Sequence, residues 1–179
     1  MEAAALLHDV DKLDAVKPDV NGLAHGDGSA EWLTRQGYPE LGPAIAGHPV
    51  TRLADAAWFT HWIASASPEA LIVSYADKRA GQRFESLAER LASWQRRYPP
   101  AERAERARGT WDAQTLENVR LRAAEIERRT CELASVTPSD VRRLEWTGRA
   151  IAAVRGASAA ARSSSAAATR RHAADTGTR

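Results

Sequence analysis

The sequence predicts an all-α protein. In several segments, apolar residues recur at intervals of three and four, which is the period of one face of an α-helix. Ser67-Pro68-Glu69 and Thr137-Pro138-Ser139-Asp140 are typical helix starts, because a capping hydroxyl precedes a proline and an acidic residue of the first turn. No stretch alternates apolar and polar residues persistently, as a half-buried strand would. We therefore expect helices joined by turns, without a sheet.

The first part of the chain predicts short helices separated by turns. Residues 2–8 are mostly Ala and Leu and are typical of the end of a buried helix, whereas the polar, turn-rich residues 9–28 predict a loop. One helix is expected over residues 29–36, closed by a glycine, and another over residues 38–48, where a proline stops it. Residues 53–63 are rich in aromatic side chains, and we interpret them as helical.

Longer helices are predicted from residue 67 onward. The helix that starts at Ser67 continues to Asp77, and the next one carries a single apolar stripe. That stripe consists of Phe84, Leu87, Leu91, Trp94 and Tyr98. Beyond residue 110, one seam of a long helix is formed by Leu116, Val119, Ala123, Ile126, Thr130 and Leu133. A further helix over residues 137–154 would pack against it as an antiparallel hairpin.

These elements divide the chain into three parts. Residues 1–98 would form the main helical domain, residues 99–155 a helical hairpin through which the protein could oligomerise, and residues 156–179 a disordered Ala/Ser/Arg tail. The last 25 residues carry five arginines and one aspartate, so the net charge of +2 and the pI near 9 reflect this tail more than the body. The charge is therefore weak support for nucleic-acid binding, and we expect no nucleic-acid partner.

Composition also bears on localisation. Cys131 is the only cysteine, which excludes an internal disulfide and fits a reducing cytoplasm. The N-terminal residues lack the basic region and cleavage pattern of a signal peptide. No apolar run approaches the roughly 18 residues that a membrane span requires. We therefore expect a cytoplasmic protein that does not bind membranes.

The strongest functional signal is a set of histidines and aspartates at helix ends or in the loop beside one. In chain order they are His8, Asp9, His25, His48 and Asp77. Imidazole nitrogens and carboxylate oxygens bind Zn and the neighbouring divalent transition metals, and helical proteins build such sites from facing helices. We interpret all five residues as metal ligands. The alternatives for His25, a turn residue, and for His48, a cation at a helix C-terminus, stay open.

The motifs HDVDK at residues 8–12, GSAEWLTRQGYPELGPAIAGH at residues 28–48 and YADKR at residues 75–79 resemble those of the HD-domain superfamily of metal-dependent phosphohydrolases. Small bacterial members of the HDIG type are the most similar in pattern. The resemblance covers residues 4–98, roughly half of the chain. It implies an HD-domain-like helical bundle that binds one or two divalent ions of Mn, Fe, Co, Ni or Zn.

The resemblance further implies which residues hold each ion. His8, Asp9 and Asp77 would bind the first, and His25 and His48 would serve the second, with Asp9 bridging them. Water activated there would attack the phosphate ester of a nucleotide or small phosphorylated metabolite. Whether the substrate is a monoester or a diester stays open.

Two further residues would act on the substrate. Lys12, which we count with Asp9 as catalytic, would contact a substrate phosphate or pair with a carboxylate, and Arg79 is a weaker candidate for the phosphate contact. One family ligand has no counterpart here, because the first histidine of the family lies on a helix well before the His-Asp pair and only seven residues precede His8. The alternative function is therefore a catalytically impaired HD-fold module that binds or scaffolds.

Overall fold

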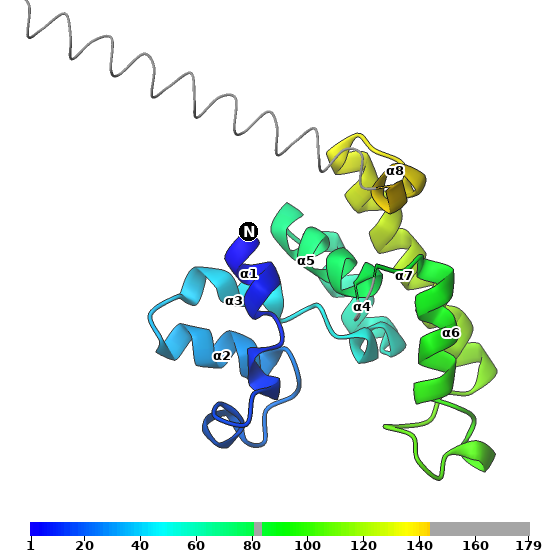
Figure 1. The fold of residues 1–179 in the computed structure, drawn as a ribbon, viewed down its shortest axis with the longest axis horizontal. Helices are drawn as coiled ribbons and strands as arrows, with labels where there is room; N and C mark the ends of the chain where they lie inside the picture. Colours follow the sequence, from blue (N-terminus) through cyan, green and yellow to red (C-terminus); the bar gives the residue numbers. More distant parts are fainter. Residues whose placement is uncertain (81–83, 144–179) are drawn as a thin grey trace, which may run out of the picture. The chain divides into compact units, whose positions relative to one another are not determined.

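The computed structural model describes residues 1–80 and 84–143, and these residues are all-α, as predicted (Figure 1). They form no β-strand, although a single bridge joins Ala80 to Phe84. One compact unit spans Met1–Val136, and a second begins at Thr137. The helices of the first unit are α1 (Glu2–Leu7), α2 (Asp27–Arg35), α3 (Gly42–Ile45), α4 (Ala56–Ser65), α5 (Pro68–Arg79), α6 (Leu87–Arg97) and α7 (Ala113–Ala134).

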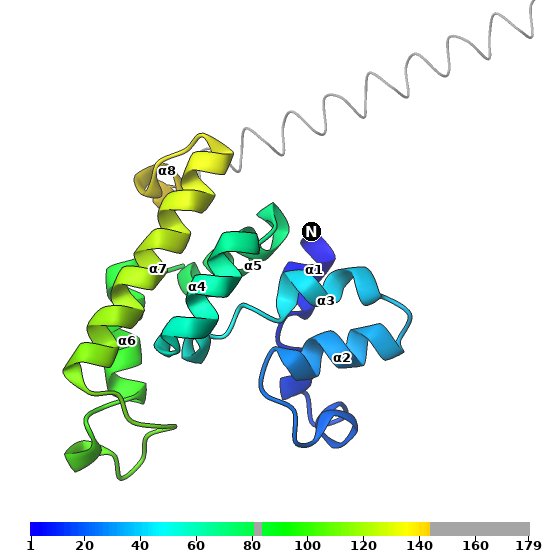
Figure 2. The same cartoon turned by 180° about the vertical axis from the view of Figure 1, so that it is seen from behind.

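Helix α5 is the central element of the first unit. It contacts α1 and α3 on one side and α6 and α7 on the other (Figures 1 and 2). Its start follows the predicted signal, since the Ser67 hydroxyl accepts a hydrogen bond from the backbone N–H of Ala70 at 3.2 Å. Val73 packs into the N-terminal core, while the Tyr75 hydroxyl donates to Glu127 of α7 at 2.8 Å. The two ends of the unit are therefore joined through one helix.

The loop predicted over residues 9–28 is a packed segment. It contains the 3₁₀ turns Val10–Lys12 and Lys17–Val20. Val10, Val16 and Val20 are buried in one cluster with residues of α1, α2, α3 and α5. An apolar side chain every few residues thus anchors a segment whose overall composition is that of a surface loop. This anchoring fixes the chain on both sides of the His-Asp pair.

Helix α1 differs from the prediction of a buried helix. Ala4 is its only buried residue, and Leu6 is 78% exposed. Only one face of the helix therefore packs against the unit, and its end delivers His8.

The two helices after α5 each begin at a side-chain cap. Ser86 and Glu89 form a capping box at the start of α6, so Phe84 lies before the helix and is 39% exposed, contrary to the predicted stripe. Along α7, Val119, Ala123 and Ile126 are fully buried. The predicted seam ends earlier than expected, because Leu133 is 56% exposed.

Helix α7 belongs to the same compact unit as the first 98 residues. We expected it in a separate extension, but it packs along α5 and against the turn Val50–Ala54. Of the second unit, the structure describes α8 (Pro138–Arg143), whose predicted cap is present, with the backbone N–H of Asp140 donating to the Thr137 hydroxyl at 3.2 Å. The remainder of the predicted hairpin and the predicted tail lie outside the described residues.

None of the helices in the described ranges is both long and apolar enough to cross a bilayer.

Candidate metal centre

The predicted ligands come together beside α5. His8 terminates α1, Asp9 begins the following 3₁₀ turn, and His25 directly precedes Gly26, the N-cap of α2. His48 lies just after α3, and Asp77 occupies the last turn of α5. The packed segment between α1 and α2 and the contact of α3 with α5 bring these four stretches of chain together.

Each of the three histidines of this cluster is held by a hydrogen bond at Nδ1. Nδ1–H of His8 donates to the Ala5 carbonyl at 2.7 Å, and Nδ1–H of His48 donates to the Ile45 carbonyl at 2.7 Å. Nδ1 of His25 lies 2.9 Å from Oδ2 of Asp11. Such bonds fix the tautomer and the ring orientation, leaving Nε2 as the free nitrogen.

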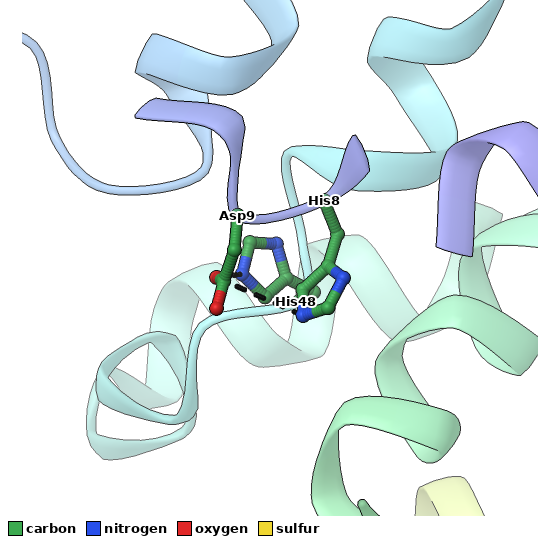
Figure 3. Close-up of side chains that lie close together, drawn as sticks. All are labelled: His8, Asp9 and His48. Carbon is green, nitrogen blue, oxygen red and sulfur yellow. Dashed lines mark hydrogen bonds and ion pairs between the residues drawn. The ribbon is translucent and has the colours of Figure 1, made fainter. Parts of the chain in front are cut away.

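The three Nε2 atoms converge on one carboxylate oxygen. Oδ1 of Asp9 lies 3.2 Å from Nε2 of His25, 3.3 Å from that of His48 and 3.7 Å from that of His8. His8, Asp9 and His48 face one another in Figure 3. Asp77 lies at the edge of the cluster, with Oδ1 3.7 Å from Nε2 of His8. The structure therefore brings all five predicted ligand residues into one cluster.

Asp11 is a member of this site that the sequence analysis missed. Its side chain is 7% exposed, and its carboxylate contacts His25 and accepts the backbone N–H of Gly26 at 3.0 Å. Gly26 suits this position because its φ is +88° and a Cβ there would lie 2.9 Å from the Ala46 carbonyl. The carboxylate also lies at the N-terminus of α2, where the helix dipole favours a negative charge. Asp11 thus orients His25 from behind.

The carboxylates of the site are ionised. Burial raises the pKa of Asp9, but the contacts of its carboxylate with the His25 imidazole and the Lys12 ammonium outweigh burial and hold that pKa well below its usual range. Burial likewise opposes ionisation of Asp77, and the neighbouring imidazole and ammonium groups still lower its pKa. The cluster therefore presents fixed negative charge to its centre.

The histidines differ in their protonation. The Asp77 carboxylate raises the pKa of His8, and for His25 two neighbouring carboxylates outweigh burial and raise the pKa as well. Burial lowers the pKa of His48, which is 1% exposed. His48 is consequently neutral near pH 7, with its one proton on Nδ1.

This protonation leaves hydrogen-bond acceptors facing one another. The lone pair at Nε2 of neutral His48 lies 3.0 Å from Nε2 of His25 and 3.3 Å from Oδ1 of Asp9. One proton can be shared between only two of these acceptor atoms, whereas a divalent cation can be bound by all of them together. A cation about 2.1 Å from each of four ligands holds them about 3.4 Å apart, close to the spacing of this cluster. The donor set therefore fits a divalent transition-metal ion, and His/carboxylate ligation suits Mn, Fe, Co, Ni or Zn.

Lys78 stabilises the backbone that carries His48. It is fully buried, and its ammonium donates to the His48 carbonyl at 2.8 Å and to the Ser74 hydroxyl at 3.0 Å. Burial lowers the pKa of this ammonium to about 8. Lys78 thereby fixes the backbone that carries His48 and compensates part of the negative charge of Asp77.

Lys12 lies at the open side of the cluster. Its Nζ is 2.7 Å from Oδ1 of Asp9, and about half of its side chain is exposed. It lines two adjoining cavities, of about 480 Å³ and about 60 Å³, and His25 lines both as well. The pairing that we expected with a carboxylate is therefore present, and the ammonium is also accessible from the cavities.

Arg79 does not belong to the site, which corrects our expectation of a phosphate contact. The residue is 2% exposed, and its guanidinium donates to the Tyr75 hydroxyl at 2.6 Å, to Glu127 at 2.9 Å and to the Glu85 carbonyl at 2.6 Å. Two residues along a helix correspond to about 200° of rotation, so Arg79 points away from the face that carries Asp77. Its role is to link α5 to α7.

Comparisons with protein-family models, with curated proteins and with solved structures found no match to this chain.

Proposed function

We propose that this protein is a metal-dependent phosphohydrolase, in keeping with the resemblance of its motifs to those of HD-domain enzymes. The observation that carries the proposal is the convergence of three imidazole Nε2 atoms on the Asp9 carboxylate, each ring being held through Nδ1. Preorganised ligands of this kind need no rearrangement to receive a cation. A divalent ion held there would activate water and polarise phosphoryl oxygens.

The cluster has the ligands for two ions. One group combines His8, Asp9 and His48, with Asp77 beside His8, and the other pairs Asp9 with His25, the ring that Asp11 orients. Asp9 is common to both, as expected of a bridging ligand. Divalent ions held by these residues would supply Lewis-acid polarisation of the phosphoryl oxygens and a water of lowered pKa.

The protein's own residues would bind and orient the substrate. The Lys12 ammonium faces the cavities and can donate to a non-bridging phosphate oxygen while it stays close to Asp9. Asp11 keeps Nε2 of His25 directed at the reaction centre, and Lys78 holds the backbone of His48. The substrate class that fits is a phosphate ester of a nucleotide or a small phosphorylated metabolite.

Hydrolysis of p-nitrophenyl phosphate and bis(p-nitrophenyl) phosphate tests this proposal. The protein is stripped with a chelator and assayed with Mn²⁺, Co²⁺, Ni²⁺ or Zn²⁺ added back. We expect turnover that requires the metal and is lost in Asp9→Asn, while Asp14→Asn, whose side chain is 96% exposed, retains it. Turnover that survives Asp9→Asn would overturn the assignment, and metal binding without turnover of any phosphate ester would favour a binding module.

A further inference from the structure

The smaller cavity carries an excess of positive charge beside the candidate metal ligands. Its lining includes Lys12, His25 and Asp77 and also Arg90, Arg97 and Arg108. The larger cavity shares Lys12, His25 and Arg108 with it and adds Lys17. The arginines come from α6 and from the chain that follows it, outside the segments that supply the ligands.

Two of these arginines are held side by side without a carboxylate partner. The backbone N–H of Arg108 donates to the Arg97 carbonyl at 3.2 Å, which folds the segment after α6 back onto the helix end. Arg97 donates to the Ser93 hydroxyl at 3.2 Å, and within the described ranges neither arginine forms an ion pair with an acid. Burial lowers the pKa of Arg97, and the charges of Arg90 and Arg108 lower it further. The protein therefore holds like charges together at this place.

Arg90, which also lines this cavity, contains a buried donor without a partner in the described part of the chain. The residue is 9% exposed, and its guanidinium donates to the Asp77 carbonyl at 3.1 Å and to Glu85 at 3.4 Å. Its Nε is buried and has no hydrogen-bond partner among the residues that the structure describes. A buried guanidinium nitrogen without a partner is costly unless a ligand or water supplies an acceptor.

We propose that Arg90, Arg97 and Arg108 form a second anion subsite, so that the substrate carries two phosphoryl groups. Arginine guanidinium groups bind phosphate oxygens in a planar, bidentate manner, and an anion would relieve their mutual repulsion. Asp77 and Lys12 line the same cavity, so a single small molecule could place one anionic group there and another at the candidate metal cluster. The other phosphoryl group would be cleaved at the candidate metal centre, and this part of the inference rests on the proposed function. A bisphosphorylated metabolite or a nucleoside polyphosphate has the required chemistry.

Binding without metal tests the subsite independently of catalysis. The affinities of methylenediphosphonate and methylphosphonate are measured calorimetrically in EDTA, for the wild type and for the double variant Arg97→Gln/Arg108→Gln. We expect the variant to bind methylenediphosphonate about tenfold more weakly or worse, since two charge-assisted contacts are lost. The matched control, Arg96→Gln/Arg106→Gln, replaces two exposed arginines of the same segments and should bind as the wild type does. Equal affinity in the two double variants would overturn the subsite.

Kinetics then test the substrate class. With metal restored, Arg97→Gln/Arg108→Gln should lower kcat/KM for a bisphosphorylated substrate about tenfold more than it lowers kcat/KM for p-nitrophenyl phosphate. An equal loss on both substrates would contradict a role specific to a second phosphoryl group. If the wild type cleaves neither substrate, the proposed function fails, while the affinities in EDTA still decide whether the arginines bind an anion.

Discussion

The Asp11 carboxylate orients the imidazole of His25, one of the candidate ligands, through a contact with Nδ1. It is 14 residues from His25 in sequence, and only the packed turns between them bring the carboxylate to Nδ1 of that ring. The sequence offered one signal, the second acid inside HDVDK, but spacing alone does not connect it with His25. The five candidate ligand residues could be picked out because their motifs are local, whereas this contact depends on tertiary packing.

Replacing Asp11 with Asn should weaken metal binding. The amide keeps the shape of the side chain but removes the negative charge that orients the His25 imidazole and raises its basicity. We expect Zn²⁺ affinity, measured by competition with a chromophoric chelator, to fall about 10- to 100-fold. Asp14→Asn, at an exposed position in the same loop, is the control. An unchanged affinity in Asp11→Asn would mean that His25 needs no partner.

Tyr75 predicts a pH dependence of stability away from the metal centre. Burial raises the pKa of its hydroxyl above the ordinary value of 10.0, and the hydrogen bond to Glu127 raises it further. The unfolded chain releases this proton near pH 10 and the native protein retains it, so the contribution of Tyr75 to the free energy of unfolding falls as pH rises above 10. The slope due to Tyr75 is about 1 kcal/mol per pH unit.

Urea unfolding between pH 9 and pH 11.5 checks this prediction. Tyr75→Phe should lose stability at every pH but show a shallower decline above pH 10 than the wild type. Tyr38→Phe, at a position that is 53% exposed, should keep the wild-type slope. Identical slopes for the wild type and Tyr75→Phe would contradict the shifted titration.

At the scale of elements, α5 serves two purposes on different faces. Asp77 and Lys78 contact residues of the candidate metal centre, whereas Arg79 reaches α7 through Glu127. The sequence placed Arg79 with the site because it lies two positions from Asp77, and helical geometry shows why that was wrong. The caps at Ser67 and Thr137 were predicted, since each depends on residues within four positions.

Breaking the link between α5 and α7 should destabilise the fold. The side chain of Arg79 is 3% exposed and that of Glu127 is 18% exposed, so Glu127→Leu leaves a buried guanidinium without its counter-charge. We expect a loss of about 3 kcal/mol in the free energy of unfolding by urea. The control is Glu117→Leu on the same helix, whose pair with Arg120 is exposed and should contribute less than about 1 kcal/mol. Similar losses for both variants would contradict a stabilising role specific to the buried pair.

For the whole molecule, the fold class followed from periodicity and caps, but the extent of the compact unit did not. A seam such as that of α7 indicates that a helix packs without indicating its partner, and Val119, Ala123 and Ile126 are fully buried within the unit that contains α5. The arginine subsite was likewise hidden, since it depends on the chain after α6 folding back onto the helix end. Long-range arrangement of this kind is encoded in packing, which no local pattern reports.

Metal content per chain tests the central claim most directly. Elemental mass spectrometry is applied to untagged protein purified without added metal, and again after dialysis against Mn²⁺ or Zn²⁺. The account predicts one to two equivalents of a divalent transition metal in the wild type, lost in Asp9→Ala and retained in Asp14→Ala. A wild-type protein that stays metal-free after dialysis would contradict it, because the convergent imidazoles and carboxylates would then have failed to bind the cation supplied.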